Sequence, residues 1–371
     1  MKGADIVPVP ASASASPKNV PNACSALARK HPSASSSPAR LAQFSIAGAN
    51  GSWLQAPSAL VRNRPRRLGW LVRSAASGAG ALALAGLSLA VVKLFRRSDP
   101  GGQSGLASDR LYQGSALLSF SLLADSALEH YRGGYSNPAM FVGPVTGLLT
   151  LSVSLFKLAR RTLPARVPIY AAAVVVGGIG LGFHLYNVGK REGGLSWQNV
   201  FYAAPLGAPA AASLAGVFGL AAGELERMEA GLSPVPRSVA ATGLGLVSSA
   251  ALAATSAEAA LLHFRGAFQN PFMLAPVTLP PLAAAALAGT VVKSTRLAIT
   301  ASRTLLGASA AIGVAGAGFH AYGIARNMGG WRNWSQMILQ GPPIPAPPAF
   351  TGSALAGLGA LRLLEMADER R

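Results

Sequence analysis

The sequence predicts an all-α fold: a polytopic membrane helical bundle of about nine transmembrane helices, formed by tandem duplication of a four-helix unit. Three observations predict this class. The 371 residues are 51% hydrophobic and only 12% charged, with 42 glycines, whereas a soluble domain carries about 25% charged residues. Apolar runs of about membrane length recur along the chain. Two similar stretches about 130 residues apart indicate an internal repeat.

Residues 1–70 differ in composition from the rest of the chain. They are rich in Ala, Ser, Pro and basic residues, and Asp5 is the only acid before Asp99. Because no helical or strand period is present, we interpret this segment as a disordered tail. A targeting segment is the alternative, either an organellar transit peptide or, on a weaker match, a twin-arginine signal. An extra transmembrane helix is expected within residues 71–98.

The duplication rests on two pairs of matching stretches. SALEHYRGGYSNPAM at 126–140 and AALLHFRGAFQNPFM at 259–273 share eight of fifteen residues. GLGFHLYN at 180–187 matches GAGFHAYG at 316–323. The repeat therefore covers nearly everything after residue 110.

Each repeat unit contains four apolar runs, and we expect each run to form a helix. In the first unit, residues 106–232, the runs cover 112–131, 141–159, 167–188 and 200–222. In the second unit, residues 236–371, they cover 240–263, 273–292, 304–325 and 345–364. Barrel strands are not indicated, because the runs are too long and too rich in Ala, Leu and Gly.

Basic residues set the expected orientation. The links between the second and third runs carry Lys157, Arg160, Arg161 and Arg166 in one unit and Lys293, Arg296 and Arg303 in the other. Both links should be cytoplasmic, which makes the repeats parallel. The net charge of +19 lies largely in such loops and in the tail, so we expect lipid rather than nucleic acid as the partner. The expected location is a bacterial inner membrane, with an organellar membrane as the alternative.

Four histidines occupy matched positions in the two units: His130, His184, His263 and His320. Each unit contributes one from its first run and one from its third, both near the non-cytoplasmic end. Two imidazoles at equal depth on adjacent helices are what a bis-His haem b site requires. We therefore predict two haem b sites. A His₄ copper or iron site across the pseudo-axis, or no cofactor at all, are the alternatives.

Residues near the histidines extend this interpretation. Arg132 and Arg265 follow the first-run histidines by two residues, where they would pair haem propionates. The residues four positions before the histidines are small, which would let a flat porphyrin lie against the helix: Ser126, Gly180, Ala259 and Gly316. Acids within membranes are costly, so Asp125 and Glu258 are candidates for proton handling, with structural pairing to the arginines weighed equally.

The pattern of paired histidines is similar to that of membrane cytochrome b subunits that anchor dehydrogenases. It departs from that family because all four histidines lie on one side of the membrane. The resemblance implies an electron-transfer subunit that joins a peripheral oxidoreductase on the non-cytoplasmic face to a quinone. The chain lacks nucleotide-binding and HExxH motifs, and its single cysteine, Cys24, excludes thiolate metal sites. A transporter or channel with Asp125 and Glu258 as coupling acids is the second hypothesis, and a structural subunit of a larger complex the third.

Overall fold

Each apolar run after residue 102 is largely helical in the structure, a computed structural model that describes residues 103–161 and 163–368. The long helices of residues 103–232, the first half, are α2 (Gln103–Arg132), α3 (Val142–Leu158), α4 (Arg166–Gly189) and α6 (Gly207–Glu229). Those of residues 236–368, the second half, are α7 (Arg237–Arg265), α8 (Ala275–Val292), α9 (Arg296–Arg326) and α11 (Pro348–Asp368). No strand occurs in these described ranges, which confirms the all-α prediction. The expected tail and the helix expected within 71–98 lie outside them.

Short helices fill the links between the long ones. They are η1 (Pro138–Phe141), α5 (Trp197–Phe201), η2 (Pro271–Leu274), η3 (Gly330–Asn333) and α10 (Trp334–Gln340). The fourth run was expected to begin at residue 200, but α6 begins only at Gly207. The reason is local: Ser196 caps α5 by accepting a hydrogen bond from the Asn199 amide, and Pro205 occupies the break that follows.

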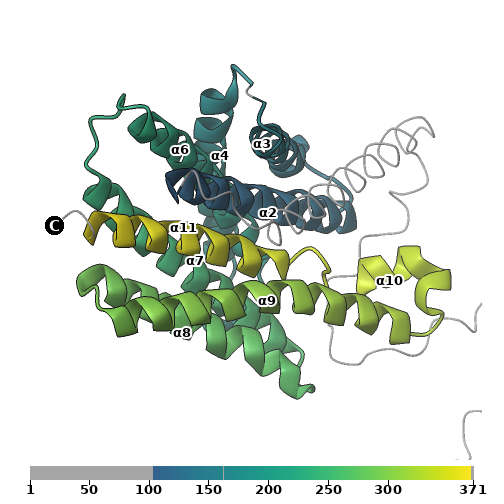
Figure 1. Cartoon of the computed structure of the whole chain (residues 1–371). Helices are drawn as coiled ribbons and strands as arrows, with labels where there is room; N and C mark the ends of the chain where they lie inside the picture. Colours follow the sequence, from purple (N-terminus) through teal and green to yellow (C-terminus); the bar gives the residue numbers. More distant parts are fainter. Residues whose placement is uncertain (1–102, 162, 369–371) are drawn as a thin grey trace, which may run out of the picture. The chain divides into compact units, whose positions relative to one another are not determined.

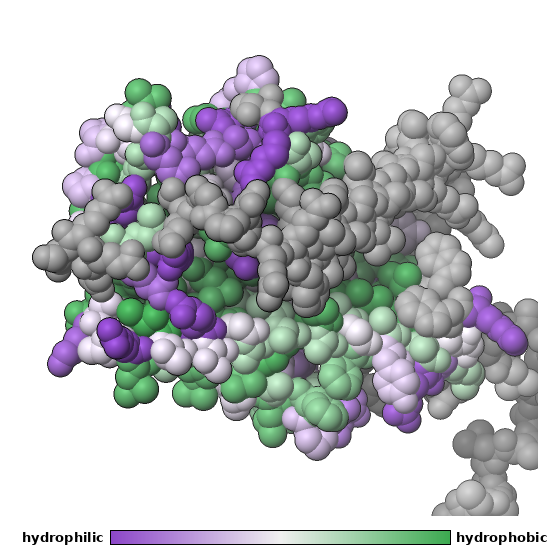
Figure 2. Space-filling view, in the orientation of Figure 1, coloured by the Kyte–Doolittle hydropathy of each residue, from purple (hydrophilic) through white to green (hydrophobic). Residues whose placement is uncertain are grey.

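Six of the long helices are long and apolar enough to cross a membrane: α3 with η1, α4, α6, α7, α8 with η2, and α9. Side chains such as Val175 and Ile179 on α4 are exposed, as a lipid-facing surface requires. Figure 2 shows apolar side chains reaching the surface over α8 and α9 as well, where Leu282 and Val314 are exposed. The chain is therefore an integral membrane protein by these criteria.

Helices α2 and α11 are not among the helices that are long and apolar enough to cross a membrane. The expected count of about nine spans is therefore not confirmed in the described part of the chain. The physical reason is their position: they pack against each other, and against α6, α7 and α9, as an inner pair (Figure 1). Helices covered by protein tolerate polar side chains such as Ser115, Ser119 and Ser353, all fully buried. Mean hydropathy therefore falls without exposing these groups to lipid.

The inner pair is antiparallel and held close by small residues. A Cβ added at Gly114 would lie 2.8 Å from the carbonyl oxygen of Gly352, so this contact needs glycine. Near the start of α2, a Cβ on Gly359 would approach Ala107 to 3.1 Å. Near the other end, the Ser121 hydroxyl donates to the Pro345 carbonyl at 2.7 Å. The first half and the second half thus meet along the length of α2.

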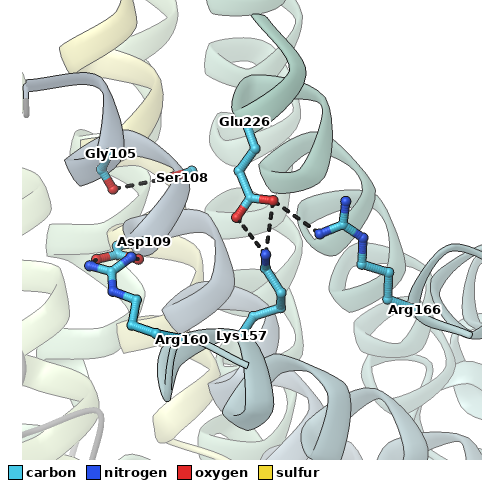
Figure 3. A network of polar contacts seen from close by, with 7 residues as sticks. All are labelled: Gly105, Ser108, Asp109, Lys157, Arg160, Arg166 and Glu226. Atoms are coloured by element: carbon cyan, nitrogen blue, oxygen red, sulfur yellow. Dashed lines mark hydrogen bonds and ion pairs between the residues drawn. The ribbon is translucent and has the colours of Figure 1, made fainter. Parts of the chain in front are cut away.

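The basic link of the first half forms an ion-pair network at one end of the bundle (Figure 3). Glu226 of α6 accepts from Lys157 at 2.8 Å and from Arg166 at 3.0 Å. Arg160 binds both oxygens of Asp109, at 3.1 and 2.9 Å. In the second half Arg303 pairs with Glu365 of α11. Since α2 and α11 are antiparallel, these charged ends of the two halves lie on the same side.

Candidate functional site

All four predicted histidines lie at the end of the bundle opposite the charged network. His130 and His263 are in the last turns of α2 and α7, while His184 and His320 are in the last third of α4 and α9. Every one of these residues is half-buried. The two halves therefore carry their histidines at corresponding places in the first and third long helices.

Each histidine ring is held by a hydrogen bond from Nδ1 to a backbone carbonyl. His130 binds the carbonyl of Met140, and His263 binds that of Met273 at 2.9 Å. His184 binds the carbonyl of Pro205 at 2.8 Å, and His320 binds that of Pro343 at 2.7 Å. A carbonyl only accepts, so Nδ1 must carry the hydrogen in all four rings. The lone pair of each neutral imidazole is then on Nε2.

The carbonyls that accept from His130 and His263 belong to two similar turns, with the sequences SNPxM and QNPxM. Asn137 accepts from the Ala139 amide and starts η1, and Asn270 accepts from the Phe272 amide and starts η2. These caps return the chain so that the Met140 and Met273 carbonyls face the rings. Asn137-Pro138 and Asn270-Pro271 therefore form the turn into the next helix.

Backbone strain and an aromatic contact complete each turn. Tyr135 and Phe268 both adopt φ of 47°, a left-handed conformation that aromatic residues rarely take. Their rings pack edge-on against the histidines, with centroids 6.1 Å apart for His130 and 6.2 Å for His263. The aromatic residue common to both repeat units therefore orients an imidazole.

The third-helix histidines are placed by close packing of the third and fourth helices of each half. A Cβ on Gly177 would lie 2.3 Å from Ser213 Oγ, and one on Gly313 would lie 2.2 Å from Thr351 Oγ1. The hydroxyl groups bind back across the contact, Ser213 to Val174 O at 3.0 Å. This contact fixes α6 against α4 and α11 against α9, and with them the proline-rich segments that supply the Pro205 and Pro343 carbonyls.

The small residues four positions before the histidines do not leave open faces for a porphyrin. A Cβ on Gly180 would lie 3.3 Å from Pro209, and one on Gly316 would lie 2.9 Å from Pro347. Ser126 is buried against Gly143. The expectation that a flat macrocycle lies on these faces was wrong for these three positions, because proline and glycine of neighbouring segments already cover them.

Within each half the two rings are near each other. His130 lies close enough to His184, and His320 to His263, for their charges to interact. Among the described residues, no three side chains of His, Cys, Asp and Glu gather around a common point that would hold a metal ion. Among these described residues, the four histidines therefore do not form a single centre.

The two arginines have partners within the protein. Arg132 pairs with Glu129 and lies 3.5 Å from the carbonyl of Ile338. Arg265 has no acid at the equivalent position, where Leu262 stands, and it turns toward the first half. It donates to the Ala203 carbonyl at 3.4 Å and lies over the ring of Phe201. The two arginines are therefore not equivalent, although the sequence places them alike.

The two candidate proton-handling acids come from different halves, Asp125 from α2 and Glu258 from α7. The Glu258 side chain lies against Gly207, where an added Cβ would come within 3.3 Å of its Cγ, and it interacts electrostatically with Arg265. Its Oε1 and the Nε of Arg265 are buried without a hydrogen-bond partner. Both residues line a cavity of about 30 Å³ beside Pro205, which is room for about one water molecule. Sequence reasoning missed this contact between halves, because nothing local to Glu258 signals it.

Comparison with known proteins adds no relative: no family model, no curated protein and no solved structure matches the chain.

Proposed function

We propose that this protein is a membrane electron-transfer subunit that binds two haem b groups, one between His130 and His184 and one between His263 and His320. It passes electrons between a peripheral oxidoreductase and a quinone. The single observation that carries the proposal is the shared hydrogen-bond pattern: all four Nδ1 atoms donate to backbone carbonyls. Metal-binding histidines almost always bind such a partner through the other ring nitrogen.

Pairing of the rings favours haem over a bare metal ion. Two imidazoles alone make a poor site for a free ion, and no third His, Cys, Asp or Glu joins them among the described residues. A haem brings four equatorial nitrogens and needs only two axial ligands. When bound, it would supply one-electron transfer, while the chain's own part is to present Nε2 at a fixed angle and to exclude competing ligands.

The neighbouring charges fit the same function. Arg132 forms a partly exposed ion pair with Glu129, worth about 0–1 kcal/mol, so a haem propionate would replace that carboxylate at little cost. We assign Arg265 the same role at the second site, with its Nε still unpaired. Asp125 and Glu258 would exchange the protons of a quinol.

Location and partners follow from the shared side of the four histidines. We propose that the halves are parallel repeats in a bacterial inner membrane, with the charged network cytoplasmic. Electrons would then enter from a peripheral subunit docked on the non-cytoplasmic face, and the quinone would be reduced near that face. Membrane lipid covers the exposed apolar helices.

A reduced-minus-oxidised spectrum of the full-length protein, extracted from haem-replete membranes, tests the proposal. We expect two bis-His b-type signals, of which His184→Ala removes one and His320→Ala removes the other. His31→Ala is the matched control, since His31 is the one histidine outside the repeats, and it should change nothing. Colourless protein from haem-replete cells would overturn the proposal.

The half-buried acids Asp125 and Glu258 favour a second candidate, a transporter with these acids as coupling groups. In that case Asp125→Asn and Glu258→Gln would abolish substrate uptake by vesicles, and the purified protein would contain no haem. Histidine variants that alter only the assembly of a larger complex would instead indicate a structural subunit.

A further inference from the structure

The proline-rich segment that orients His184 is held from the second half of the protein. Pro205 supplies the carbonyl that His184 binds at 2.8 Å. Two residues before it, the Ala203 carbonyl accepts from Arg265 of α7 at 3.4 Å. Directly after it, Gly207 packs against Glu258, which lies about two turns before Arg265 on α7. The carbonyl that positions His184 therefore lies between two contacts made by α7.

The reverse contact holds the segment that orients His320. Pro343 supplies the carbonyl that His320 binds at 2.7 Å. Pro345, two residues later, accepts from Ser121 of α2 at 2.7 Å. Earlier in the same segment, Ile338 accepts from Arg132 of α2 at 3.5 Å. The first helix of each half thus braces the segment that positions the third-helix histidine of the other half.

The close contact at Glu258 depends on glycine. A Cβ on Gly207 would lie 3.3 Å from Glu258 Cγ, tighter than most side chains accept. Gly207 is also the first residue of α6, where a negative charge interacts favourably with the exposed amides of the helix. The Glu258 side chain therefore lies at the junction between the proline-rich segment and α6.

We propose that Glu258 and Arg265 are positioning residues for His184, and that Ser121 and Arg132 are positioning residues for His320. In each pair, the ring orientation of one histidine is then fixed by the turn that follows its own helix. The ring orientation of the other histidine depends on contacts from the opposite half. The consequence is coupling: a change at the first helix of one half alters the site of the other half. The part of this proposal that concerns haem rests on the proposed function, whereas the imidazole geometry does not.

The inference makes a prediction that a simple folding defect does not share. Glu258 is on the same helix as His263, yet the ring of His263 is held by Met273 within its own turn. Removing the Glu258 carboxylate should therefore disturb the distant His184 and spare the near His263. A general loss of structure would disturb all four rings together.

Nitrogen NMR of ¹⁵N-histidine-labelled full-length protein in lipid bilayers measures this without any haem. Single His→Gln variants assign the signals. In Glu258→Leu we expect the hydrogen-bonded Nδ1–H signal of His184 to be lost or to split between tautomers, with those of His130, His263 and His320 unchanged. Glu258→Gln keeps nearly the same side-chain shape against Gly207 and should restore the His184 signal.

Glu192→Leu is the control, because that carboxylate is exposed in the loop after α4. Arg132→Leu and Ser121→Ala should act on His320 in the same selective way. An unchanged His184 in Glu258→Leu, or a change confined to His263, would overturn the inference. A protein that shows the selective shifts but binds no haem would refute the proposed function. The inference that each half positions a histidine of the other half would still hold.

Discussion

The hydroxyl of Ser213 in α6 donates to the carbonyl of Val174 in α4, with 3.0 Å between the oxygens. Thr351 of α11 makes the equivalent bond to Ala310 of α9 at 2.8 Å. Both bonds cross a glycine contact that brings the two helices to backbone distance. The position of the third-helix histidines depends on these contacts, since they fix where the proline-rich segments begin.

Gly177→Ala should therefore destabilise the protein. The new Cβ would lie 2.5 Å from the Ser213 nitrogen and 2.6 Å from the Pro209 carbonyl oxygen, so backbone must move. We expect a loss of about 1–3 kcal/mol, the usual effect of overpacking. Thermal unfolding in detergent, followed by circular dichroism, measures it.

The adjacent Gly178→Ala is the control for that prediction. A Cβ there meets nothing within 4 Å, and replacing a helical glycine by alanine favours the helix by about 1 kcal/mol. The two variants should therefore shift the unfolding temperature in opposite directions. Equal shifts would mean that the α4–α6 contact is not as close as described.

Asn137→Ala should loosen the turn that positions His130. The Asn137 side chain accepts from the Ala139 amide at 2.9 Å, and loss of such a cap costs about 1 kcal/mol. We expect a lower unfolding temperature and a broadened Nδ1 signal from His130 in the NMR experiment. Asn187→Ala, on the exposed face of α4, serves as the control and should leave both unchanged.

Glu226→Gln should destabilise the charged end more than Asp109→Asn. Glu226 binds both Lys157 and Arg166, and the Lys157 side chain is only 12% exposed, so its charge would be left poorly solvated. We expect a loss of about 1.5–3 kcal/mol, typical of a hydrogen bond to a charged group. The partner of Asp109 is Arg160, which is 73% exposed, and that pair should contribute about 0–1 kcal/mol. Unfolding by denaturant at low and high salt compares the two, and a larger effect at Asp109 would contradict the assignment.

His184→Met should retain the haem of the first site and raise its midpoint potential, because a thioether in place of one imidazole is typical of higher-potential cytochromes. A redox titration followed by visible absorption measures both sites at once. The second site, with His263 and His320, should titrate as before. If neither potential moves while two haems stay bound, His184 is not a ligand.

Labelling from the two sides of the membrane tests the proposed orientation. In a Cys24→Ser background, Arg161→Cys and Lys293→Cys should react with an impermeant thiol reagent from the cytoplasmic side. Glu192→Cys and Met328→Cys should react only from the opposite side, since they follow α4 and α9. All four positions are exposed. Labelling of Arg161 and Lys293 positions from different sides would exclude parallel repeats.

Much of the helical content was predictable because it is encoded locally. Hydropathy marks a helix over each apolar run, and α3 and α8 match the predicted runs closely. The turn after His130 was predictable too, since Asn137 and Pro138 favour that conformation whatever surrounds them. The start of α6 was missed because a capped short helix and Pro205 interrupt an otherwise apolar run.

The site was predictable only in part. Matched spacing identifies His130, His184, His263 and His320 from the sequence alone, and their ring partners could not be identified in the same way. Met140 lies ten residues from His130, within one turn, whereas Pro205 lies 21 residues from His184. The difference between Arg132 and Arg265 also arises from contacts made far along the chain.

By itself the sequence determined an all-helical membrane protein, the approximate place of the long helices after residue 102 and the matched spacing of the four histidines. These depend on hydropathy and on backbone preferences that act within a few residues. Only the tertiary structure decided that α2 and α11 form an inner pair, that each imidazole binds a carbonyl through Nδ1, and that Glu258 contacts Gly207 across the two halves. The reason is physical: such contacts depend on which helix surfaces meet, and close packing of whole helices settles that rather than any short stretch of chain.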